Sequence, residues 1–243
     1  MRAGEGETHD SIFRAANYPV GAVNPRDPSE IDVTVASYIN RHSDETRRNP
    51  CVPQGYNPDT FQPLYTGVKT PGACNNDIVI SRSGNGGRSF TGGSRDVRTL
   101  PAARDGDNQA DQFWQWAAFD RRGRLAVSFY DRAYGDDEQT GFSDLSLSGT
   151  RDGVNFGTTR VTTASMPPES QFEGDFFGDY SGLTADDVAH PAWADSRDPD
   201  LFVCRDSAGH VTQPPSVCTA GADNAPYAND ENVFTDAVAI PLR

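Results

Sequence analysis

Three short segments of the sequence bring together the residue types that could bind and process an acidic ligand. Each combines aromatic or apolar residues with Asp or Asn and then Arg, and they occupy residues 37–41, 128–132 and 193–197. If the segments take equivalent places in a repeated module, Arg41, Arg132 and Arg197 could clamp a carboxylate, because guanidinium groups bind it in a bidentate manner. The simpler alternative is structural, with Asp131 and Asp195 forming salt bridges to arginines within or between modules.

The elements that must position these segments are short β-strands. Gly and Pro interrupt the chain every 8–12 residues, and helical periodicity is almost absent. A charged, Gly-containing segment at 119–124 lies between two alternating apolar stretches and predicts a hairpin turn. We therefore predict an all-β fold with strands at Ile31–Ile39, Asp77–Ser81, Phe113–Asp120, Leu125–Tyr130, Phe142–Ser148, Thr158–Thr163, Ala189–Asp195, Asp200–Cys204 and Asn232–Ile240.

A repeated turn accompanies the repeated strand ends. After the first two of these segments come a loop, another strand and a Gly-rich turn that ends in Phe, at 83–90 and 148–156. After the third segment, we expect the hairpin between Cys204 and Cys218 to take the place of this turn. Three antiparallel modules at about 15–100, 101–165 and 166–243 are typical of propeller blades within one domain, 1–243. The alternative is a β-sandwich whose strand ends are alike by chance.

The turn at 83–90 resembles the Asp-box of sialidases, Ser-x-Asp-x-Gly-x-Thr-Trp, with Asn85 in place of Asp and Phe90 in place of Trp. In the second copy, Asp152, Gly153 and Phe156 remain. The Asx side chain should accept backbone hydrogen bonds, Gly should supply a positive φ, and the aromatic ring should plug the blade. Two such turns in register with a second motif make the chain similar to bacterial sialidase-like (exo-α-sialidase, BNR-repeat) β-propellers, in their C-terminal half.

This resemblance implies a partial six-bladed propeller, with about three four-stranded antiparallel blades and a ligand over the central funnel. It also implies a sialidase-like glycoside hydrolase or glycan-binding propeller acting on sialic-acid-type or related glycans. A Tyr nucleophile suits a substrate that carries its own carboxylate. The candidates are Tyr180 with Glu173 as the nucleophile pair and Asp131 or Asp195 as acid and base, while Asp179 joins the three arginines in substrate binding. The Phe/Tyr-Arg-Ile-Pro signature of true sialidases is absent, and Phe13-Arg14-Ala15-Ala16 is only similar to it.

The alternative function is a non-catalytic interaction or structural propeller that binds protein or cations. With 21 Lys and Arg against 35 Asp and Glu, the net charge is −14, which argues against nucleic acids and anionic membranes as partners. Half a ring leaves apolar faces and strand edges bare. We therefore expect either a missing N-terminal half or a second copy that completes it as a homo-oligomer.

The four cysteines favour an extracellular location. Cys51 and Cys74 bracket one loop, and Cys204 and Cys218 bracket another. Neither pair has the spacing of a zinc site, so of the three possible connectivities we predict disulfides between nearest neighbours. Export requires a signal peptide with an apolar stretch, and residues 1–10 are polar and do not supply one. We expect the chain to be part of a longer secreted protein or an engineered fragment.

Three further segments carry weaker signals. The run at 113–116, Phe-Trp-Gln-Trp, predicts a buried strand, although an exposed Trp could stack on a sugar ring. The acidic loops at 105–111 and 136–138 offer oxygen ligands that Ca²⁺ accepts, but without EF-hand spacing. They include Asp105, Asp107, Asn108 and Asp111, and we expect solvated loops here and no required cofactor.

Overall fold

In the computed structural model, the described part of the chain is built entirely from β-strands and connecting turns, so the all-β prediction is confirmed. No helix in this part has the length and apolar character that crossing a membrane would require. The structure describes residues 18–37, 40–41, 55–56, 63–64, 76–92, 99–104, 110–134, 142–166, 181–199, 201–203, 207–208, 210, 217–219 and 229–243.

The first sheet has three antiparallel strands in the order β1-β2-β5, with bounds Val20–Val23, Ile31–Ser37 and Asp77–Ser83. Burial alternates along β2, as expected for a strand with two different faces. Its fully buried face carries Asp32 and Thr34. Arg82 on β5 neutralises Asp32 through two hydrogen bonds, at 2.7 and 2.8 Å.

The second sheet has four antiparallel strands in the order β6-β7-β8-β9, with bounds Gln112–Phe119, Leu125–Asp131, Asp144–Thr150 and Gly157–Arg160. Every residue of β7 and β8 is buried. The predicted hairpin joins β6 to β7, where Asp120 N donates to Arg124 O and Gly123 takes a φ of 77°. The register of β6 against β7 shifts between Phe113 and Trp116, and Trp114 has a φ of 49° inside this bulge.

The third sheet has the order β10-β11-β14, with bounds Gly182–Ala185, Ala189–Pro199 and Asn229–Thr235. Two small hairpins accompany the larger sheets. They pair β3 with β4, Gly55–Tyr56 with Pro63–Leu64, and β12 with β13, Leu201–Val203 with Val217–Thr219.

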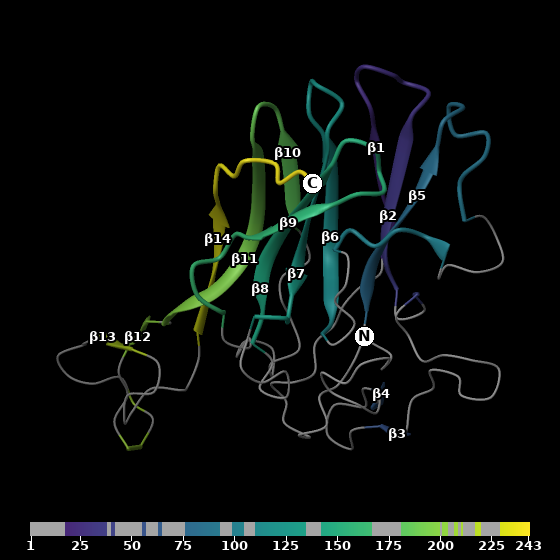
Figure 1. Cartoon of the computed structure of the whole chain (residues 1–243). Coiled ribbons are helices and arrows are strands. Elements are labelled where there is room, and N and C mark those ends of the chain that lie inside the picture. Colours follow the sequence, from purple (N-terminus) through teal and green to yellow (C-terminus); the bar gives the residue numbers. More distant parts are fainter. Residues whose placement is uncertain are drawn as a thin grey trace.

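The three larger sheets lie side by side, with the four-stranded sheet in the middle (Figure 1). Its first strand, β6, contacts β1, β2 and β5 of the first sheet and β10 of the third. Alternate residues of β7 contribute to different cores, since Val127 and Phe129 pack with the first sheet while Ala126 and Tyr130 belong to the clusters on the side of the third. Because the middle sheet is covered on both faces, its central strands are buried throughout.

The segment after β14 links the third sheet to the second. Val238 forms an isolated bridge with Ala189 of β11, and Leu242 forms one with Phe156 just before β9. The segment passes directly over Gly149, where an added Cβ would lie 2.4 Å from a methyl group of Ile240. A residue with a side chain does not fit at this crossing without moving the segment.

One expectation about the third module is wrong. The Gly-rich turns follow β5 and β8, the third strands of their sheets, whereas the β12–β13 hairpin lies between β11 and β14, the second and third strands. The hairpin therefore does not take the place of the turn. That place is held by Asp236, directly after β14, whose carboxylate accepts a hydrogen bond from Ala237 N at 2.7 Å.

Candidate functional site

The candidate site lies where β2, β7 and β11 end and their neighbours β5, β8 and β14 begin. Antiparallel pairing puts Ser37 opposite Asp77, Asp131 opposite Asp144, and Asp195 opposite Asn232. These ends, at the lower side of the three sheets in Figure 1, are called the strand-end face below. All three repeated segments reach it, so the question is whether their arginines are available to a ligand.

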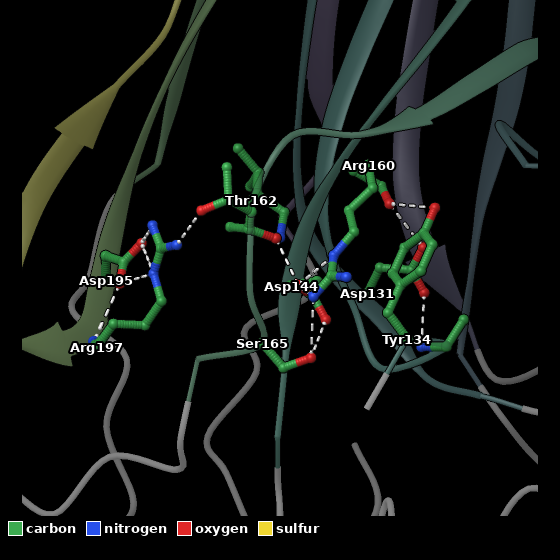
Figure 2. Close-up of polar contacts among 12 residues, drawn as sticks. Asp131, Tyr134, Asp144, Arg160, Thr162, Ser165, Asp195 and Arg197 are labelled. Carbon is green, nitrogen blue, oxygen red and sulfur yellow. Dashed lines mark hydrogen bonds and ion pairs between the residues drawn. The ribbon is translucent and has the colours of Figure 1, made fainter. Parts of the chain in front are cut away.

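Arg197 is bound to Asp195 on the same strand (Figure 2). Its Nε and Nη2 atoms donate to the carboxylate at 2.8 and 2.6 Å, and its Nη1 atom donates to Thr163 at 3.1 Å. Trp193 adds a hydrogen bond from its indole to Asp195 at 2.9 Å. Burial opposes ionisation of the carboxyl, but these hydrogen bonds outweigh it and hold the pKa of Asp195 below its ordinary value. The Asp195 side chain is fully buried and ionised at neutral pH, which does not suit a general acid.

Asp131 takes its partner from elsewhere in the chain. Its carboxylate forms an ion pair with Arg104, 27 residues earlier, and accepts hydrogen bonds from Ser146 Oγ at 2.8 Å and Ala133 N at 3.0 Å. The neighbouring Arg132 has only 1% of its surface exposed. Asp131 is therefore a buried, ion-paired carboxylate, and Arg132 is a buried residue.

The first copy of the motif differs again. Asn40 is buried and donates from its side chain to Ser37 O at 3.0 Å, while Arg41 is exposed. Among the three predicted clamp residues, one is exposed, one is buried and one is ion-paired. The structure does not give them one shared environment on the strand-end face.

A third buried carboxylate on this face, Asp144, was not among the predicted residues. Asp144 accepts hydrogen bonds from Arg160 at 2.8 Å, from Thr162 and from Ser165 at 2.8 Å (Figure 2). Tyr134 forms cation–π contacts with two arginines on this face. The guanidinium groups of Arg160 and Arg104 each lie 5.1 Å from the centre of its ring. The signal in the sequence was weak, since Asp144 and Arg160 lie on separate strands that only the register brings together.

Three more buried polar residues lie between the first and second sheets. Asn76 N donates to Asp111 Oδ1 at 2.8 Å, and Gln112 N donates to Asn76 O at 2.9 Å. The second oxygen of Asp111 and both side-chain amides are buried and have no hydrogen-bond partner within the described part of the chain. Asp111 was named as one possible Ca²⁺ ligand, and the amide oxygens would supplement it. In the described residues, however, no three His, Cys, Asp or Glu side chains group as metal ligands.

The other candidate residues are placed as follows. Trp114 is buried, as predicted for a strand interior, but 39% of the Trp116 surface is exposed. For the remaining candidate residues, either the whole residue or its side chain lies outside the described part of the structure. They are Tyr180, Glu173, Asp179, the acidic residues at 105–108 and 136–138, and Cys51, Cys74, Cys204 and Cys218.

The two Asp-box-like turns form the expected hydrogen bonds at the opposite ends of the strands. Asn85 Oδ1 accepts from Ser89 N at 3.0 Å, and Asp152 Oδ1 accepts from Asn155 N at 2.8 Å. Hydrogen bonds from Asn155 and Val154 lower the pKa of Asp152 well below its ordinary value. Gly86 and Gly87 in the first turn and Gly153 in the second have positive φ, 70°, 82° and 72° respectively.

The aromatic residue acts as a plug in only one of the two turns. Phe156 is 3% exposed and belongs to the core between the first and second sheets, whereas Phe90 is 38% exposed. The turns also connect the sheets, because Arg82 Nη1 on β5 donates to Asp152 O at 2.6 Å. These residues hold the fold together.

Neither protein-family models nor curated proteins gave a match to this sequence. The chemistry of the strand-end face therefore follows from its geometry. Its carboxylates are buried and its arginines are largely committed to them. This arrangement offers little free charge to a ligand.

Proposed function

We propose that the protein is a partial, sialidase-like β-propeller that acts as a non-catalytic, glycan-binding module. The proposed absence of catalysis rests on one observation, the ion pair in which Arg197 and Asp195 are bound to each other. A carboxylate clamp needs guanidinium groups that are free in the apoprotein, and a general acid needs a carboxyl that can be protonated near neutral pH.

The propeller part of the proposal has two supports. The sheets are antiparallel and lie side by side, and the first strand of the middle sheet, β6, contacts the first strands of both neighbours, β1 and β10. Equivalent turns follow the third strand in the first and second sheets, as blades of one repeated design require. Three such blades would make half of a six-bladed ring.

Completion of this ring would involve a second copy or a further segment of a longer protein. Measuring the mass in solution tests the first possibility, with a dimer expected at twice the 26.3 kDa of the chain. A monomer that unfolds in a single cooperative transition would refute completion by a second copy.

The glycan-binding part of the proposal rests on Trp116. This ring is on β6, the strand that contacts both neighbouring sheets, and it keeps 39% of its surface exposed. An aromatic face of this kind stacks on the apolar face of a sugar ring. We therefore expect Trp116 to contribute a main contact to a sialic-acid-type or related glycan.

Two measurements on the full chain test the proposal. Hydrolysis of a fluorogenic sialoside should be absent, and binding of sialyllactose should weaken about fivefold to tenfold in Trp116→Ala but little in Trp116→Phe. Turnover that disappears in Tyr180→Phe and Arg197→Ala would instead establish a hydrolase. Binding that is equal in both Trp116 variants would remove this residue from the ligand site.

A further inference from the structure

A pocket lined by arginines lies at the ends of the sheets opposite the strand-end face. The turns β1–β2, β6–β7 and β8–β9 form it, and its volume is about 290 Å³. Apart from Gly123, the residues that line it are Arg26, Arg122, Arg124 and Arg151. We call it the arginine pocket. A chain with a net charge of −14 thus gathers four cations, and no carboxylate, around one hollow.

Two of these arginines are held in place by neighbouring acidic residues. Arg124 Nε donates to Asp120 at 2.5 Å, and its Nη2 atom donates to Asp187 O at 3.0 Å. Arg122 forms an ion pair with the Asp187 carboxylate at 3.0 Å. Asp120 is itself fully buried and accepts the backbone N–H groups of Arg122 and Arg124, so the whole turn is fixed.

The other two arginines have no such partners. Within the described chain, neither Arg26 nor Arg151 has an ion pair or a side-chain hydrogen bond, and both are exposed. Their acidic neighbours are engaged elsewhere, since Asp27 accepts from Ser29 N at 3.1 Å and Asp152 accepts the backbone N–H groups of its own turn. Two guanidinium groups in the arginine pocket therefore remain available to a ligand.

The close packing of the turns makes the wall of the pocket. Gly123 has a φ of 77°, and a Cβ at this position would lie 3.0 Å from the side-chain amide of Asn24 in the β1–β2 turn. The two turns can approach this closely because residue 123 has no side chain. Arginines from three different turns consequently line one volume.

We propose that the arginine pocket binds a tetrahedral oxyanion, the sulfate or phosphate group of a small ester. A planar carboxylate is satisfied by one or two guanidinium forks, whereas a tetrahedral oxyanion has oxygens for donors that approach from several sides. The volume accommodates the anion and part of the molecule that carries it. This site is independent of the glycan contact at Trp116 and of the strand-end face.

Isothermal titration of the full chain at constant ionic strength tests the proposal, with inorganic sulfate, inorganic phosphate and acetate as probes. Sulfate or phosphate should bind at least tenfold more tightly than acetate. Arg26→Ala and Arg151→Ala should each weaken binding at least fivefold, and the Lys variants should weaken it less. Arg88→Ala removes an exposed arginine from the neighbouring β5 turn and should change the affinity less than twofold.

The outcomes separate cleanly. Equal affinities for acetate and sulfate, or equal losses in Arg26→Ala and Arg88→Ala, would overturn the proposal. Glucosamine 6-sulfate and glucose 6-phosphate then show which ester is preferred. Because Arg26 and Arg151 make no side-chain hydrogen bonds in the described chain, both variants should fold, which circular dichroism verifies. Sialyllactose binding should be unchanged in them, so failure here leaves the proposed function standing.

Discussion

Replacing Arg197 by Ala would test whether the repeated Asp–Arg motif is structural. The substitution removes the guanidinium group and leaves the Asp195 carboxylate fully buried. Two hydrogen bonds to that carboxylate survive, from the Trp193 indole at 2.9 Å and from the backbone N–H of residue 197 at 3.0 Å.

The expected loss of unfolding free energy is about 2 kcal/mol. Removing one partner of a fully buried ion pair costs about 3–5 kcal/mol because a charge is left without compensation. Here the arginine side chain is 23% exposed, and solvent and the two surviving hydrogen bonds compensate part of the loss. Asp195→Asn should cost less, about 1 kcal/mol, since the remaining cation can reach water.

Urea unfolding at pH 7 measures both variants, and Arg121→Ala is the matched control. Arg121 also forms ion pairs, with Asp186 and Asp187, but its side chain is 60% exposed, so its removal should change stability much less. The structural interpretation of the motif fails if Arg197→Ala is no more destabilising than Arg121→Ala.

The remaining predictions concern pH and the turns. The pKa of Asp195 is lowered in the fold, so its ion pair contributes stability above the unfolded pKa of about 3.9 and loses this contribution as the pH falls further. The difference in unfolding free energy between wild type and Arg197→Ala should therefore narrow below about pH 4. A difference that stays constant with pH would indicate lost packing instead. In urea unfolding, Phe156→Ala should lower the unfolding free energy by about 3–4 kcal/mol and Phe90→Ala by less than about 1 kcal/mol, because the two rings are 3% and 38% exposed. Equal losses of unfolding free energy would mean that both rings are packed in the core. Gly153→Ala should lower the melting temperature, since its φ is 72° and a Cβ would lie 2.2 Å from the Arg82 guanidinium group; an unchanged melting temperature would show that this turn tolerates a side chain.

Much of the fold was predictable because strand signals are local. All nine predicted segments overlap observed strands, including β2, β7 and β8, whose apolar residues stand out from their neighbours. The strands that were not predicted are short. β1 and β10 have four residues each and contain glycine, and they are extended mainly because they pair with β2 and β11. A signal that depends on the partner strand is absent from the segment itself.

The candidate site was harder to predict because its partners are distant in the chain. Asp195 and Arg197 are two residues apart, and their pairing was one of the two alternatives. Asp131 stands directly before Arg132, which suggests the same arrangement, yet its ion pair is with Arg104. Sequence adjacency could not reveal this, because consecutive residues of a strand point to opposite faces of the sheet.

The repeated Asp–Arg motif cannot easily serve both as a structural ion pair and as a ligand-binding cation. An arginine that shares a face with its own aspartate, as Arg197 does two residues after Asp195, is neutralised and strengthens the strand end. Arg132, which directly follows Asp131 at the end of β7, is instead buried. In these two copies of the motif, neither arginine is an exposed, uncompensated cation. In the described part of the chain, Arg26 and Arg151 lie exposed in turns and have no side-chain partner, and this is why we expect anion recognition there rather than at the repeated motif.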